Sequence, residues 1–79
     1  MTTPHPPPQR PDQAAELLAA LVDEHLEVDR DVIPLTAETW AIHGYLAYEG
    51  EVIAATFATE RDAWAGISLL EEIQRRATR

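Results

Sequence analysis

The sequence contains no cysteine, which excludes disulfide bonds, zinc knuckles, iron–sulfur ligation and thiol catalysis. Lysine is also absent, so every basic residue is an arginine. The glycines, at positions 44, 50 and 66, are too far apart to form a phosphate-binding loop. No apolar run approaches the ~18 residues of a membrane span, and no signal peptide is visible at the N-terminus. We therefore expect a cytoplasmic protein.

The distribution of proline and of apolar residues predicts one small folded domain. Five of the 6 prolines fall within residues 1–11, which we expect to form a disordered, proline-rich arm. Hydrophobic residues make up 46% of the chain, which is typical of a globular protein. The folded domain is expected to span residues 12–76, followed by a flexible tail at 77–79.

Residues 12–28 carry the strongest helical pattern in the chain, and Asp12 is a suitable N-cap. One face of this expected helix carries Ala14, Leu17, Leu18, Leu21, Val22, His25 and Val28. The opposite face carries Glu16, Asp23 and Glu27, with Glu24 beside them. The pattern predicts an amphipathic helix that presents a row of acids to solvent.

Residues 39–48 and 51–58 are the main expected strands, joined by a two-residue turn at Glu49-Gly50. This turn would pair Leu46 with Ile53 and would place the large apolar side chains on one face of the sheet. That face would carry Trp40, Ile42, Leu46, Ile53 and Phe57. The other face would carry Ala41, His43, Tyr45, Ala47, Val52, Ala54 and Thr56. Residues 32–35 are compatible with an extra short edge strand, which Pro34 disfavours.

Residues 60–76 predict a second helix that begins with a capping box of Thr59 and Asp62. Its buried stripe would consist of Ala63, Gly66, Ile67, Leu70 and Ile73. The sequence thus predicts an α+β fold in the order helix, β-hairpin, helix, with both helices on one face of an antiparallel sheet. This order is similar to that of double-stranded-RNA-binding domains. That family needs a basic loop and a basic start to its second helix, where this chain is mostly acidic, so we expect no membership.

No arrangement of residues predicts catalysis. His25 and Asp29 would suit two metal ligands on one helix face, but no second histidine lies nearby. His43 and Tyr45, with an acid such as Glu51, have the chemistry for proton transfer. A fold this small leaves little room for an enclosing pocket. We therefore expect a protein that is not an enzyme and that binds no metal or cofactor.

The charge of the chain indicates how it acts. Acidic residues number 14 against 6 basic ones, and residues 11–60 alone sum to −10, with Arg30 as their only base. This charge opposes direct binding to nucleic acid or to anionic membranes and favours a basic protein partner.

We expect a non-enzymatic interaction protein, of the inhibitor type that covers a surface built to grip nucleic acid. Small acidic proteins of this type occur among phage anti-defence factors, including anti-CRISPR proteins, and among antitoxins, but no motif here identifies either group. The alternative is an accessory or structural subunit of an enzyme or assembly, in which the acids only improve solubility.

The expected partner-binding surface combines the acidic helix face with exposed aromatic residues. Its residues are Glu16, Asp23, Glu24, Glu27, Tyr45 and Trp64. On a continuous helix the three acids of the outer face would be spaced by ~10 Å and ~6 Å along the axis, close to two or three phosphate steps. The open edges and the mild second face of a small sheet also predict a homodimer.

Overall fold

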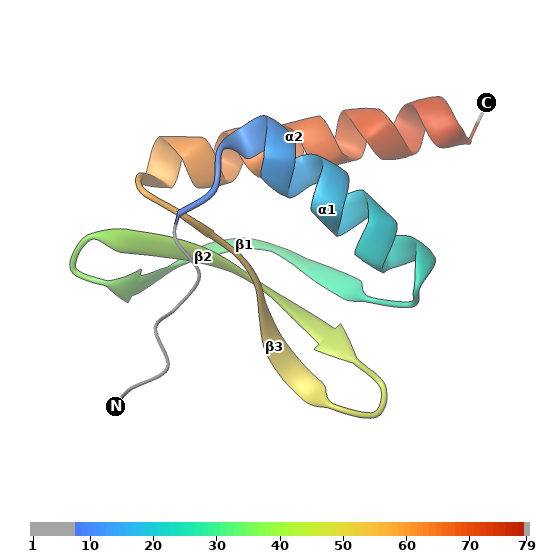
Figure 1. Cartoon of the computed structure of the whole chain (residues 1–79), viewed down its shortest axis with the longest axis horizontal. Coiled ribbons are helices and arrows are strands. Elements are labelled where there is room, and N and C mark those ends of the chain that lie inside the picture. Colours follow the sequence, from blue (N-terminus) through green and yellow to red (C-terminus); the bar gives the residue numbers. More distant parts are fainter. Residues whose placement is uncertain (1–7, 79) are drawn as a thin grey trace.

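Residues 8–78, which the computed structural model describes, form a helix, a three-stranded antiparallel sheet and a second helix (Figure 1). The elements are α1 (Pro11–Asp23), β1 (Glu27–Thr36), β2 (Thr39–Leu46), β3 (Gly50–Phe57) and α2 (Glu60–Ala77). The strands lie in the order β1-β2-β3, and the two helices pack together and against one face of the sheet. The predicted α+β fold is therefore confirmed, and the extra edge strand is part of it.

The chain enters the fold through the end of the proline-rich segment. Residues 1–7 of the predicted arm lie outside the described residues. Pro11 is the first residue of α1. Proline is well tolerated there, because the backbone N–H at this position makes no hydrogen bond within the helix. The N-cap is Arg10, which makes no side-chain cap hydrogen bond, so the prediction of Asp12 as the N-cap is wrong.

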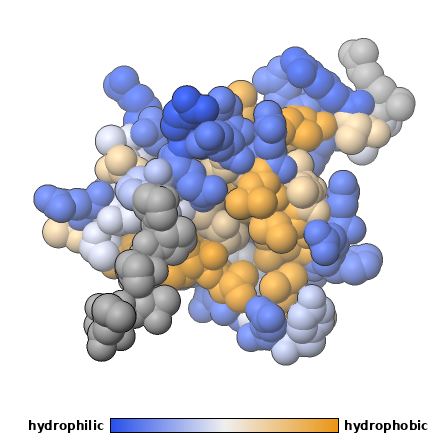
Figure 2. Space-filling view, in the orientation of Figure 1, coloured by the Kyte–Doolittle hydropathy of each residue, from blue (hydrophilic) through white to orange (hydrophobic). Residues whose placement is uncertain are grey.

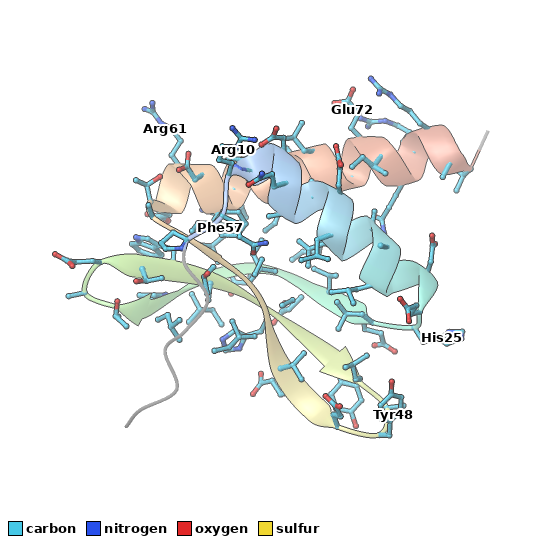
Figure 3. All side chains as sticks on the ribbon, viewed as in Figure 1. Arg10, His25, Tyr48, Phe57, Arg61 and Glu72 are labelled. Atoms are coloured by element: carbon cyan, nitrogen blue, oxygen red, sulfur yellow. The ribbon has the colours of Figure 1, made fainter. Side chains whose placement is uncertain are left out.

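The core lies between the helix layer and the sheet (Figure 3), and its largest fully buried apolar side chains come from four elements. They are Phe57, Leu18, Ile42 and Leu70. Trp40 and Leu46 are half-buried against the same cluster. Burial of each large side chain contributes about 1.5–3 kcal/mol. The predicted core face is thus confirmed for all of its members except Ile53.

Helix α2 matches its prediction closely. The Thr59 hydroxyl oxygen accepts a hydrogen bond from the Asp62 backbone N–H at 3.0 Å, as the capping box requires. The predicted stripe faces the core, with Ala63, Gly66, Ile67 and Leu70 buried and Ile73 half-buried. The helical period of the apolar residues and the capping residues predicted the same helix, and the structure contains both features.

Helix α1 ends five residues earlier than its pattern predicts. His25 adopts a left-handed backbone conformation with φ of 77° and donates its N–H to the Val22 carbonyl at 3.0 Å. The Leu26 N–H donates to the Leu21 carbonyl at 3.0 Å, which completes a Schellman motif. Leu26, the residue after His25, is only 4% exposed and packs in the core at the end of the helix. The placement of His25 on the apolar helix face is therefore wrong, and its side chain is exposed at the α1–β1 turn (Figure 3).

The segment freed by this early stop becomes β1, a strand of 10 residues rather than a short one at 32–35. Val28 and Val32 are half-buried against the core, and they pair with Gly44 and Ile42 of β2. A bulge between the two valines accommodates the intervening charged residues. Pro34 is tolerated because β1 is an edge strand.

The hairpin between β2 and β3 has a different register from the predicted one. Leu46 pairs with Gly50, across a turn in which the Glu49 N–H donates to the Leu46 carbonyl at 3.1 Å. Gly50 has a φ of 81°, which suits the left-handed position that closes a three-residue turn. The predicted pairing of Leu46 with Ile53 and the two-residue turn are both wrong.

A bulge in β3 then changes which side chains face the core. Ile42 pairs with Ala55 but His43 pairs with Ile53, so Ala54 is the extra residue. The bulge interrupts the alternation, so Val52 packs against the core and Ile53 turns outward, 42% exposed. The predictions that Ile53 faces the helices and that Val52 and Ala54 lie on the outer face are therefore wrong.

Candidate protein-binding surface

The face of the sheet opposite the helices carries a shallow depression of about 290 Å³. Its polar lining comes from all three strands: Glu27, Asp29, His43, Tyr45 and Glu51. Val28 and Gly44 complete the lining. We call this depression the acidic pocket.

Strand register explains why these side chains meet. Tyr45 on the central strand pairs with Glu27 of β1 on one side and with Glu51 of β3 on the other. Paired residues point to the same face of a sheet, so the two carboxylates flank the tyrosine. His43 lies two residues before Tyr45 and therefore shares its face. The bulge in β3 is what brings Glu51 into this row, because without it Glu51 would face the helices.

Most of the negative charge in the acidic pocket has no counter-charge among the described residues. The Glu51 carboxylate lies 3.4 Å from His43 Nδ1, while Glu27 and Asp29 make no ion pair within residues 8–78. The arginines that do form ion pairs in this part of the chain form them elsewhere: Arg10 with Asp12, Arg30 with Glu71, and Arg76 with Glu72. Within the part of the chain that the structure describes, Glu27 and Asp29 are therefore carboxylates without a counter-charge beside an exposed aromatic ring.

The structure divides the predicted partner-binding residues between two layers. Glu27 and Tyr45 meet in the acidic pocket. Glu16, Asp23 and Glu24 are exposed, on α1 or at its C-cap. The prediction placed Glu16, Asp23 and Glu27 on one helix at a spacing close to that of phosphates. This prediction is wrong, because α1 ends at Asp23 and Glu27 lies in β1.

Trp64, the sixth predicted residue, lies apart from both groups on α2. It is 44% exposed, and its Nε1 donates a hydrogen bond to Glu60 Oε2 at 3.3 Å within the same helix. The one side-chain donor of Trp64 is therefore used within α2, and Trp64 does not line the acidic pocket.

Sequence reasoning did not place Asp29 in a surface site with Glu27 and Tyr45, and it gave Glu51 only a proton-transfer role beside His43. The signal for Asp29 was the alternation of Leu26 and Val28 with Glu27 and Asp29, which also fits a strand. The helical period of residues 12–28 masked it, because Val28 satisfies both patterns. His25 lies in a turn and Asp29 in β1, so the helix face on which they were weighed as metal ligands does not exist.

A second open hollow, of about 240 Å³, is lined by residues of the two helices. Leu69 and Ile73 of α2 contribute its apolar lining, and Asp12 and Glu16 of α1 its acidic lining. Glu72 and Arg76 also line it, and their side chains form an ion pair with each other at 2.6 Å. Part of its charge is thus already compensated, unlike that of the acidic pocket.

Two further properties of the described residues concern metal ions and membranes. Within residues 8–78, no group of three or more histidine, aspartate or glutamate side chains is arranged to hold a metal ion. In the same part of the chain, neither helix is both long enough and apolar enough to cross a membrane.

Comparison with known proteins returned no relatives. No model of a known protein family matches the sequence, and neither the curated proteins nor the solved structures contain a match.

Proposed function

We propose that this protein is a small acidic interaction protein whose acidic pocket receives basic side chains of a partner protein. The observation that supports the proposal is the convergence of Glu27, Asp29 and Glu51 around Tyr45 on the helix-free face of the sheet. Neither Glu27 nor Asp29 has a basic partner within the described residues. Carboxylates in such a position attract a guanidinium or ammonium group.

The aromatic ring adds a second element of recognition. Tyr45 is 51% exposed and stands between two carboxylates of neighbouring strands. A cation held by those carboxylates would also contact the ring, and cation–π contacts at exposed sites contribute about 0.5–1 kcal/mol. Arginine suits this site better than lysine because its planar group both stacks on rings and forms bidentate bonds to carboxylates.

The energetics favour an extended basic surface over a single side chain. Each exposed ion pair contributes only about 0–1 kcal/mol, so useful affinity requires several contacts. The net charge of −8 would also accelerate the approach of a cationic partner through long-range attraction. A surface that grips nucleic acid has these properties. By occupying such a surface, the protein would act as an inhibitor of nucleic-acid binding.

An oligoarginine peptide, titrated into the isotope-labelled protein and followed by NMR, tests this proposal. We expect the largest shifts in the backbone amides of β2 near Tyr45 and in Glu27 and Glu51. The variant Glu27→Lys/Glu51→Lys should lose most of the affinity. The matched variant Asp23→Lys/Glu24→Lys changes the net charge equally at the end of α1 and should retain it.

Two outcomes would contradict the proposal. One is a set of shifts that spreads evenly over the acidic surface or concentrates on α1. The other is an equal loss of affinity in both double variants. Shifts concentrated on α1 would place the binding surface there instead. Evenly spread shifts, or an equal loss of affinity, would mean that the acids act only through net charge, as expected of an accessory subunit that they merely keep soluble.

A further inference from the structure

The two outer edges of the sheet differ in how well they are protected against pairing with another strand. β1 carries charged side chains at Glu27, Asp29, Arg30 and Asp31, a bulge, and Pro34. Charges, bulges and proline are the features by which natural edge strands avoid adding a further strand. β1 is therefore a blocked edge.

β3 lacks most of this protection. Its sequence from Gly50 to Phe57 contains one charged residue, Glu51, and no proline. The Gln9 backbone N–H donates to the Thr56 carbonyl at 2.8 Å, which occupies the edge near its C-terminal end. No other segment among residues 8–78 pairs with the outer edge of β3. Among these described residues, nothing covers the outer side of β3 from Gly50 to Ala55, and its protective features are the bulge and Glu51.

Apolar surface flanks this available edge. Ile53 of β3 is 42% exposed, and Leu17 of α1 is 47% exposed. Val52 and Leu21 are half-buried and pack against the core. Figure 2 shows hydrophobic surface over α1 and, below it, over β3, with hydrophilic surface on either side. The edge therefore offers both unpaired backbone groups and apolar contact area.

We propose that this edge binds a second copy of the chain, with the two β3 strands antiparallel across a two-fold axis. Charge argues for this occupant. A copy carrying −8 is repelled by most of the surface, and β3, with Glu51 as its one charged residue, is the less charged of the two edge strands. A basic partner would instead be drawn to the carboxylates of the acidic pocket. Antiparallel strands also pair with themselves in an isologous manner, which closes the assembly at a dimer.

The geometry of this dimer follows from the pairing. A two-fold axis between antiparallel strands runs perpendicular to the sheet and joins the two three-stranded sheets into one. The helices of both copies then lie on one side, and both acidic pockets lie on the other. The dimer does not depend on what those pockets bind, so the two proposals can fail separately.

The absence of cysteine makes a direct test simple. In Ile53→Cys, mild oxidation should give a covalent dimer of twice 8.8 kDa, because residues near the middle of the free edge approach their copies across the axis. Trp64→Cys is the matched control, since Trp64 has a similar exposure of 44% but lies on α2. It should form no covalent dimer under the same oxidation. Equal cross-linking of both variants would contradict the proposal.

Sedimentation of the unmodified chain supplies the second measurement. We expect a concentration-dependent mass that rises from 8.8 kDa toward twice that value. Leu17→Lys/Ile53→Lys should shift the dissociation constant upward by at least tenfold, with an unchanged circular dichroism spectrum because both side chains are exposed. Trp64→Lys should leave the constant unchanged. A wild-type chain that remains a monomer at millimolar concentration would overturn the inference.

Discussion

The ring of Phe57 lies directly against the backbone of Gly66, so that β3 and α2 approach each other more closely than a side chain there would allow. A Cβ atom at position 66 would stand 2.9 Å from Phe57 Cζ and 3.0 Å from Cε2. Phe57 is fully buried and among the largest side chains of the core. Gly66 is therefore a packing requirement in the middle of a helix that would otherwise favour alanine.

Gly66→Ala is expected to lower the free energy of unfolding by about 1–2 kcal/mol. Helix propensity alone would raise it by about 1 kcal/mol, but the added methyl group would displace a buried ring, and overpacking costs about 1–3 kcal/mol. Urea unfolding followed by circular dichroism measures the difference. Phe57→Leu in the same chain should reduce the penalty of Gly66→Ala. A more stable Gly66→Ala variant would show that the helix can move away from the ring.

His25→Gly is expected to raise the free energy of unfolding by about 0.5–1 kcal/mol. His25 has a φ of 77°, and an L-residue in this conformation is strained by roughly 1–2 kcal/mol, which exceeds the extra chain entropy of glycine. Asp23→Gly is the control, because Asp23 is the last helical residue of α1 and glycine should be destabilising there. Thermal unfolding compares the two. If both variants lose stability, the positive φ at His25 costs less than the added chain entropy of glycine, and the prediction is wrong.

The bulge in β3 predicts opposite tolerances at two neighbouring positions. Val52→Thr should cost about 1–2 kcal/mol, because the new hydroxyl would face the core. Ile53→Thr should cost less than 1 kcal/mol in the monomer, since this side chain points to solvent. Denaturant unfolding at low protein concentration gives both values. If Ile53→Thr costs more than Val52→Thr, the side chain of Ile53 faces the core, as it would in a β3 strand without the bulge.

Binding of a cationic partner is expected to weaken as salt rises. Between about 50 and 500 mM salt the Debye length falls roughly threefold, so most of the long-range attraction should disappear. The association rate should fall more steeply than the dissociation rate changes, because steering acts on the encounter. Stopped-flow or surface-based kinetics with the oligoarginine peptide separates the two rates. An affinity that is unaffected by salt would rule out an electrostatic mechanism.

Parts of the fold could be read directly from the sequence because their signals were local and consistent. In α2, a helical period, a Thr59–Asp62 capping box and arginines in the last turn all indicate the same element. Trp40, Ile42 and Leu46 follow strict alternation along β2, so their common face was correctly predicted. Each of these signals depends only on residues that are close to one another in the sequence.

The candidate site was less accessible from the sequence. Glu27 was correctly expected to be exposed, but it was assigned to a helix, and its meeting with Tyr45 could not be foreseen. Glu51 and Asp29 join the pocket only because three strands place them side by side. The chain separates Asp29 from Glu51 by 22 positions, and no local pattern reports such a distance.

The sequence by itself determined most of the core, the helical character of residues 60–76 and the acidic character of the surface, because periodicity and charge act over short stretches of chain. The tertiary structure decided three points: where α1 stops, which residue of β3 bulges and which acids share the acidic pocket. At His25 no glycine marks the stop, and the local strain is offset by the burial of Leu26 beneath the helix end. At Ala54 the extra residue is selected because it lets both Phe57 and Val52 face the core. Both choices depend on contacts between distant segments, and such contacts exist only once the sheet and helices have packed.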